Sequence, residues 1–264
     1  MSVAARAAKQ LLLVGDPGQI GPVVTADLSA FTKWNRSPHA PAPTVFERRP
    51  DFVTFPIRQT YRLGPETVAL VAGMYPFPFV SRRAPQRIER LDGTPLPEVG
   101  HIPVGEAEGV NDPKLLLAAI EHASGLVGCT HAVKGADGVI VRKTLNAADV
   151  AVVAAYNTQV SFIRSRLDEA GLKEIEVGTA DRLQGGQWAA VVAVDPTAGA
   201  DNMAGHNVSP GRMCVMPSRH TSHLCWVGED TPTWRARISG GDLPARDRGI
   251  AIQIRLKLDK TPCM

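Results

Sequence analysis

The sequence predicts an α/β fold in which a parallel sheet is covered by helices on both faces. The chain of 264 residues is 44% hydrophobic, which is enough to bury a large core in one or two domains. Its apolar runs are continuous rather than alternating, and they lie at residues 11–14, 150–155, 175–177, 189–194 and 224–227. Continuous runs of this kind are typical of parallel strands that are buried on both sides.

The N-terminal part contains one predicted strand, a long connection and a helix. The strand at residues 11–14 ends in a turn of Gly, Asp and Pro at residues 15–18. Residues 26–56 are rich in Pro, Arg and polar residues, which indicates a long connection and a domain junction. Residues 66–74 carry apolar side chains at the spacing of a helix that packs on a core.

Local signals predict the elements of the remaining chain. Asp112 as N-cap and Pro113 in the first turn predict the start of a helix that runs to residue 123. The other predicted elements are a strand at 101–104, a loop or hairpin turn at 136–138, a helix at 158–170 and an alternating strand at 249–258.

Composition excludes several classes of protein. The net charge is +3, from 29 basic and 26 acidic residues, which is too balanced for a histone-like or polybasic protein. No apolar run reaches the roughly 18 residues of a membrane span, and the first ten residues lack the features of a secretory signal. The four cysteines form no CxxC pair, and no His/Cys group has zinc-ligand spacing, so we expect no metal site and a reducing, cytoplasmic setting.

Polar residues follow or adjoin several predicted elements, and ligands of open α/β sheets bind at the carboxyl ends of strands. Asp16 and Gln19 follow the first strand and could sense a phosphate or its water, with a plain tight turn as the alternative. Tyr61 could stack on a base while Arg62 binds a phosphate, although such pairs are commonplace. Arg219 could be an arginine finger that stabilises phosphoryl charge, or a surface residue.

Two further segments join a strand to a helix or a turn. Residues 156–159 begin the helix predicted at 158–170, and the free backbone N–H groups of a helix N-terminus suit phosphates. The alternative is that Asn157 or Thr158 only caps the helix. Residues 178–187 include a pair of glycines, which permits close approach of the backbone.

In this order, the segments resemble the C-terminal half of a superfamily 1 helicase, with its UvrD-like AAA domain, nearest to the RNA-surveillance and DNA-replication helicases. The matching segments are motif III at 15–19, motif IV at 59–62, the PYxxQ segment at 155–159, motif V at 178–185 and motif VI at 212–219. The resemblance implies a RecA-like sheet of the P-loop NTPase type. It also implies a remnant of a preceding RecA-like domain with a linker at 1–56, a second RecA-like domain at 57–230 and a C-terminal tail at 231–264.

Members of that family hold ATP with Mg²⁺ between two RecA-like domains and move single-stranded DNA or RNA across their surface. The resemblance implies a nucleotide site in which Gln19, Arg62 and Arg219 reach the γ-phosphate, Tyr61 stacks on adenine, and Asp16, Gln184, Gly185 and Gln187 lie nearby. It implies that a nucleic-acid strand is contacted by Tyr156, Thr158, Gln159 and Thr179.

The sequence also departs from the family pattern. It contains neither a GxxxxGK[ST] phosphate loop nor an apolar strand that ends in Asp-Glu. We therefore expect an upstream segment or a second chain to supply them, and no ATP hydrolysis by this chain alone. Motif VI has Cys214 for the usual Asn, and Pro217 stands where a helix is expected. The alternatives are a degenerate module that binds nucleic acid or a partner without turnover, and a chain without activity.

Overall fold

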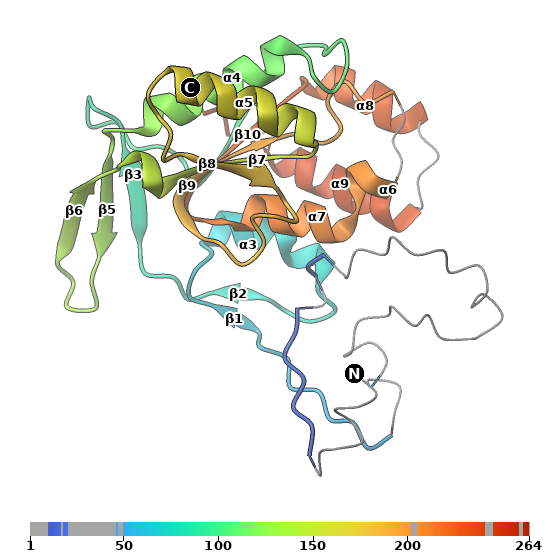
Figure 1. Ribbon diagram of the computed structural model, residues 1–264. Coiled ribbons are helices and arrows are strands. Elements are labelled where there is room, and N and C mark those ends of the chain that lie inside the picture. The colour runs from blue at the N-terminus through green and yellow to red at the C-terminus, as the bar shows by residue number, and fades with distance from the viewer. Residues whose placement is uncertain are drawn as a thin grey trace.

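A five-stranded parallel sheet forms the centre of the fold, as the sequence predicts (Figure 1). The computed structural model describes residues 10–16, 18–20, 46, 50–201, 205–240, 245–258 and 261–263. In spatial order the strands are β4 (Val99–Pro103), β10 (His220–Gly228), β9 (Trp188–Val194), β7 (Val150–Ala154) and β8 (Glu176–Thr179). Every neighbouring pair is parallel. The architecture confirms the α/β class and fits a RecA-like sheet.

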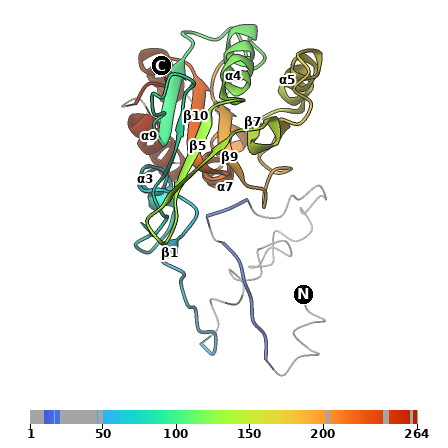
Figure 2. The ribbon, with the colours of Figure 1, turned by 90° about the vertical axis from the view of Figure 1, so that its left-hand side faces the viewer.

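Successive residues of the central strands enter two different cores. In β7 the even-numbered residues join one core and the odd-numbered residues join the other. Helices α4 (Pro113–Leu126) and α5 (Asn157–Glu169) cover the first core, whereas α3 (Pro65–Val71), α7 (Pro210–Val215) and α9 (Ala245–Leu258) cover the second (Figure 1 and Figure 2). Because both faces are covered, these strands need apolar residues at every position.

Two smaller sheets lie beside the central one. An antiparallel sheet contains β3 (Gln86–Glu89), β5 (Thr130–Lys134) and β6 (Ile140–Thr144). Strands β5 and β6 form the hairpin expected around residues 136–138, where Gly138 adopts a φ of 82° that favours glycine. A short parallel pair joins β1 (Gln59–Thr60) to β2 (Val80–Ser81).

The remaining elements are short or C-terminal. They are α6 (Gly205–Val208), α8 (Thr231–Gly240) and the 3₁₀ turns Ala72–Met74, Ala147–Asp149 and Met216–Ser218. Among the described residues, no helix combines the length and apolarity that crossing a membrane requires.

The predicted start of α4 is confirmed. Pro113 occupies the first turn, and the Asp112 carboxylate accepts a 2.8 Å hydrogen bond from the backbone N–H of Lys114. The second Asp112 oxygen accepts from the backbone N–H of Glu108 at 2.8 Å. Asp112 therefore fixes both the helix start and the loop before it.

Two predicted strands are wrong. Residues 11–14 form no strand, and Leu12 and Val14 are each 86% exposed, because no neighbouring strand in the described structure pairs with them. Residues 249–258 belong to helix α9 rather than to an alternating strand. Their apolar residues also fit a helical period, and Ile250, Ile254 and Leu258 are buried against the sheet as one helix face.

Pro217 does not interrupt a helix. Helix α7 ends at Val215, and Pro217 lies in the first turn of the 3₁₀ turn that follows. A proline in a first turn removes no intrahelical bond, so the cost expected for proline inside the motif VI helix does not arise.

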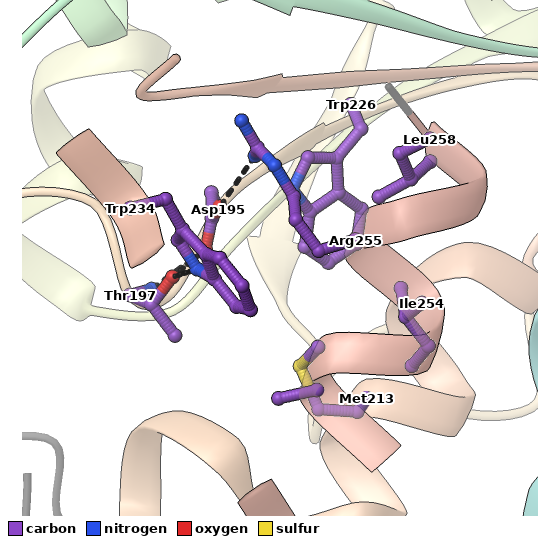
Figure 3. Close-up of a pocket in the computed structure, with 9 residues that line it drawn as sticks. Asp195, Thr197, Met213, Trp226, Trp234, Ile254, Arg255 and Leu258 are labelled. Atoms are coloured by element: carbon purple, nitrogen blue, oxygen red, sulfur yellow. Dashed lines mark hydrogen bonds and ion pairs between the residues drawn. The ribbon is translucent and has the colours of Figure 1, made fainter. Parts of the chain in front are cut away.

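The C-terminal helices are joined to the sheet by a buried polar network (Figure 3). The guanidinium of Arg255 on α9 is 3.2 Å from the Asp195 carboxylate, which follows β9. The Trp234 indole on α8 donates to Thr197 Oγ1 at 2.8 Å, and Thr197 Oγ1 donates to Asp195 at 2.5 Å. Helices α8 and α9, which lie in the predicted C-terminal tail, are thereby held to the sheet. The division into domains itself stays a prediction.

Candidate functional site

Three segments that are far apart in the sequence meet at the amino ends of β9 and β10. They are the loop at residues 15–20, Arg62 after β1 and Arg219 directly before β10. The backbone N–H of Trp188, the first residue of β9, donates to Arg219 O at 3.0 Å. The site therefore lies at the amino-end edge of the sheet, formed by the strand starts. The opposite edge is formed by the carboxyl ends of the strands, at which ligands of open α/β sheets are expected.

Arg219 and Arg62 are two cations that are close together and short of partners. Arg219 is 1% exposed, and it donates from Nη2 to Ser218 Oγ at 3.0 Å. The Nε atoms of both arginines are buried without a hydrogen-bond partner among the described residues. Burial, followed by the charge of Arg62, lowers the pKa of Arg219 to about 10. Burial also lowers the pKa of Arg62, so the site holds positive charge at an electrostatic cost.

The loop at residues 15–20 brings an acid and an amide to the arginines, and Gln184 of the 180–187 loop adds a second amide. Asp16 accepts from Gln19 Nε2 at 2.7 Å and from the backbone N–H of Gly18 at 2.9 Å. Gln19 Oε1 in turn accepts from Gln184 Nε2 at 3.2 Å. The structure thus brings together Asp16, Gln19, Arg62, Gln184 and Arg219, all of which the resemblance implied for one site.

Two residues of the site, Tyr75 and Cys214, were not among the residues predicted from the sequence. The Tyr75 hydroxyl donates to Asp16 Oδ2 at 3.2 Å and lies 3.6 Å from Cys214 Sγ. Burial raises the pKa of both groups, that of Cys214 to about 11, so both are neutral at physiological pH. Tyr75 also contacts the ring of Phe79, with centroids 4.8 Å apart. The aromatic and proline run at residues 75–79 was the signal in the sequence for this wall of the site.

Gly211 explains how the loop at residues 15–20 reaches α7. A Cβ on Gly211 would lie 2.8 Å from Ile20 Cα and 2.9 Å from Gln19 O. These distances are shorter than van der Waals contact, and the atoms are backbone. Glycine in α7 is therefore needed for the backbone of Gln19 and Ile20 to lie against this helix.

The other residues predicted to contact the nucleotide are exposed to solvent. Tyr61 precedes Arg62 and is 74% exposed, which leaves its ring available for stacking. Gly185 adopts a φ of 91° in the exposed loop after β8, and Gln187 is exposed directly before β9. Their roles stay predictions.

The predicted nucleic-acid residues lie at the other edge of the sheet. Thr179 ends β8 and pairs in register with Ala154 of β7, two residues before Tyr156. The Thr158 hydroxyl is exposed and donates to Asn111 Oδ1 at 3.0 Å. This edge is formed by the carboxyl ends of β7 and β8.

Gln159 has a local role at this edge. It is fully buried, and its side-chain oxygen accepts from the backbone N–H groups of Ala155 and Tyr156 at 3.0 and 3.2 Å. Its amide nitrogen donates to Val110 O. Gln159 thus orders the turn between β7 and α5, and its contact with a nucleic acid stays a prediction.

A loop at residues 180–187 connects the two edges. It leaves the carboxyl end of β8 at Thr179 and returns to the amino end of β9 at Trp188. Asp181 forms a 3.1 Å ion pair with Arg212 of α7. Gln184 bonds to Gln19 farther along the same loop.

Two comparisons with known proteins agree with this arrangement. The AAA domain family model matches residues 131–231, a segment that contains the 156–159 turn, the 180–187 loop and Arg219. Over 91 residues the chain is 35% identical to the DNA polymerase alpha-associated DNA helicase A of Schizosaccharomyces pombe. The aligned stretch covers 34% of this chain and 14% of that relative. These matches agree with the fold: residues 131–231 are similar to an AAA domain, and part of the chain is similar to a DNA helicase.

Proposed function

We propose that the cluster around Arg62 and Arg219 is one half of an ATP site in a superfamily 1 helicase. The observation that carries the proposal is a pair of guanidinium groups, on buried Arg219 and half-buried Arg62, whose buried Nε atoms lack partners among the described residues. A polyphosphate supplies the anionic oxygens that such cations need, with charge-assisted hydrogen bonds. The other half, with the phosphate loop and the Mg²⁺ carboxylates, would come from polypeptide outside residues 1–264.

The neighbouring polar groups suit the end of a triphosphate. Gln19 is oriented by Asp16 on one side and by Gln184 on the other, so its amide is held in place before a ligand arrives. Pre-oriented donors cost no reorganisation during reaction, which is why they stabilise developing phosphoryl charge. Mg²⁺ would shield the phosphate oxygens when bound. The Asp16 carboxylate repels the γ-phosphate unless that shielding or the arginines outweigh it.

We further propose that the carboxyl edge of β7 and β8 contacts single-stranded DNA or RNA. The exposed hydroxyl of Thr158 and the start of α5 suit backbone phosphates. The Schizosaccharomyces pombe relative is a DNA helicase by name, which supports a nucleic-acid partner of this kind. Loss of affinity with increasing salt is the expected signature of phosphate contacts.

The second candidate function is a module that binds nucleic acid or a partner chain without turnover. The exposed side chains of Leu12 and Val14 favour a partner, since apolar residues at a strand-like segment associate readily with another chain. Exposed Gln187, where the family usually has Glu, removes a charge near the proposed nucleotide site and favours this candidate also.

One binding experiment tests both candidates. A fluorescent ATP analogue and a labelled single strand are titrated separately into the full chain, with Mg²⁺ present and across a salt series. We expect Arg62→Met to weaken nucleotide binding at least tenfold, because a hydrogen bond to a charged group contributes about 1.5–3 kcal/mol. Arg142→Met is the matched control, since Arg142 is an exposed cation on β6.

The outcomes separate the two candidates. Nucleotide binding that weakens in Arg62→Met and not in Arg142→Met supports the half-site. Binding of the strand alone, at equal affinity in both variants, supports the second candidate and refutes the nucleotide proposal. Hydrolysis of ATP by the purified chain in a single-turnover assay would refute the requirement for a second half.

A further inference from the structure

Three side chains with metal-binding atoms meet on the face of the sheet that α4 covers. They are His122 on α4, His223 on β10 and Cys263 in the C-terminal segment. One ring nitrogen of each histidine and the Sγ atom of Cys263 lie within 4.8 Å of one another. The two histidines approach at 3.0 Å through their Nε2 atoms. None of the three has a part in the proposed nucleotide site or nucleic-acid edge.

His223 is oriented as metal-bound histidines are. Its Nδ1 is 2.7 Å from Pro97 O, and only a protonated Nδ1 can donate to that carbonyl. In the neutral ring the proton on Nδ1 leaves a lone pair on Nε2, which faces His122. Bonding of the outer nitrogen to a backbone carbonyl is the usual means by which proteins fix the tautomer and direction of a ligating imidazole.

Backbone hydrogen bonds fix the position of Cys263. Its backbone N–H donates to His101 O at 3.0 Å, and the backbone N–H of His101 donates to Thr261 O at 2.9 Å, so the segment runs beside β4. The Arg90 guanidinium donates to Cys263 O at 2.6 Å. Gly100 provides the space for the thiol, since a Cβ there would lie 2.3 Å from Cys263 Sγ.

The ligand set and its spacing suit zinc. Two imidazole nitrogens and one thiolate are a borderline-soft set that Zn²⁺ prefers. Zn–N bonds of about 2.0 Å in a tetrahedron place two nitrogens about 3.3 Å apart, so the histidine pair needs only a small separation. A water would take the fourth position.

We propose that His122, His223 and Cys263 form a zinc site that ties the C-terminal segment to α4 and β10. The site is buried, with Cys263 2% and His223 0% exposed, while half-buried His122 provides the side from which an ion enters. The three residues come from elements far apart in the sequence, which is why no local spacing indicated a metal. The ion would fasten residues 261–263 to α4 and β10, in addition to the backbone bonds with His101 and the bond from Arg90.

The test uses the full chain, freed of metal with a chelator and kept in a reductant that does not bind metals. Co²⁺ is then added, because tetrahedral Co²⁺ with a thiolate ligand has a sulfur-to-metal absorption band and intense visible bands. We expect one Co²⁺ per chain, displaced by one Zn²⁺. Addition of Zn²⁺ should also raise the temperature of unfolding of the metal-free chain.

Two variants and one control make the test specific. Cys263→Ser should remove the sulfur band and weaken Zn²⁺ binding more than the 10–100-fold that loss of an outer partner typically costs, so by at least about 100-fold. His122→Ala should keep the fold, since Ala favours helices and His122 is only half-buried, but should lose the intense visible bands. Cys129→Ser is the control, because Cys129 is a buried thiol bonded to Gly125 O outside the cluster.

The proposal is overturned if the metal-free chain binds no Co²⁺. It is also overturned if Cys263→Ser and Cys129→Ser give the same spectrum as the unaltered chain. Circular dichroism and urea unfolding of each variant show whether it is folded, so a lost band in a folded Cys263→Ser chain supports the site.

Discussion

Arg219→Met removes a buried positive charge that has no carboxylate partner within 4 Å among the described residues. Methionine has a flexible side chain of similar length, so it fills the space without creating a large cavity. If Arg219 exists to bind an anion, the ligand-free chain tolerates it at a cost. The substitution should then stabilise the chain while it removes the binding of nucleotide.

The structure sets the magnitude of this effect. Lowering the pKa of Arg219 from its ordinary value to about 10 corresponds to a cost of about 3 kcal/mol to the folded, charged state. Loss of the 3.0 Å bond to Ser218 Oγ returns about 1 kcal/mol of that. We therefore expect Arg219→Met to raise the free energy of unfolding by about 2 kcal/mol.

Arg255→Met is the matched control. Arg255 is as deeply buried as Arg219, at 2% against 1% exposed, but it is paired with Asp195 at 3.2 Å. Its removal leaves a buried carboxylate without its cation, which costs about 3–5 kcal/mol. The same chemical change should thus have opposite signs at the two positions.

The assay is urea unfolding followed by tryptophan fluorescence. Trp226 and Trp234 are both buried, so their emission reports the loss of the core. A change in midpoint at constant slope measures the change in stability. The pKa of Arg219 is about 10 in the folded chain and higher in the unfolded chain, so neither state exchanges this proton between about pH 6 and pH 9. The stabilisation should therefore be the same throughout that range.

A decrease in stability on Arg219→Met would refute the reasoning, because it would make the arginine a structural residue. A second readout is the shift in unfolding temperature on addition of a non-hydrolysable ATP analogue with Mg²⁺. The unaltered chain should be stabilised according to ligand concentration and affinity. Arg219→Met should lose this response although it begins from a higher unfolding temperature.

Three further predictions follow from other contacts. Asp112→Ala should lower the free energy of unfolding by about 1 kcal/mol in urea titration at neutral pH. Although burial opposes it, hydrogen bonds from two backbone N–H groups lower the pKa of Asp112. The stabilisation by the Asp112 carboxylate is therefore present at neutral pH and is lost as the pH falls through the acid range, so the unfolding free energies of the variant and the unaltered chain should converge at acid pH. Gly211→Ala should weaken binding of the ATP analogue while urea unfolding changes by less than about 1 kcal/mol, since its Cβ would displace half-buried Ile20 while alanine favours the helix by a compensating amount. Gln184→Ala should leave the affinity for a single strand unchanged and reduce the effect of that strand on nucleotide affinity, measured by titration with and without the strand.

The sheet could be predicted because its strands are simple in physical terms. In β7 and β9 every residue but the half-buried Trp188 is buried, so the sequence has continuous apolar runs that no exposed element would tolerate. The start of α4 was equally local, because Asp112 bonds to the backbone two residues later. Signals of this kind depend on neighbours in the sequence.

The wrong predictions depend on packing between distant elements. Residues 249–258 fit both a strand and a helix period, and the second core selected the helix by burying Ile250, Ile254 and Leu258. Residues 11–14 are apolar enough for a strand, but a strand needs a partner, and none of the described strands pairs with them. Local pattern contains no information about either outcome.

The same distinction holds for the candidate site. Arg62, Arg219 and Gln19 could be named from ordered motifs, because each motif is contiguous in the sequence. Tyr75 and Gly211 belong to none of these motifs: the run at 75–79 indicated only an aromatic segment, and the contacts of both residues arise where the loop at residues 15–20 crosses α7. The zinc ligands are the extreme case, with one ligand on each of three separate elements.

The two edges of the sheet give the proposed activities a physical connection. A single strand of nucleic acid bound at Thr179 would contact the first residues of the 180–187 loop. Gln184 in that loop donates a hydrogen bond to Gln19. The Asp181–Arg212 ion pair fixes the same loop to α7, on which the backbone at residues 19–20 rests. A shift of the 180–187 loop would therefore change the position of Gln19 relative to the arginines. By thermodynamic reciprocity, a nucleotide that orders Gln19 through this loop would change the binding free energy of the nucleic-acid strand by the same amount as the strand changes that of the nucleotide.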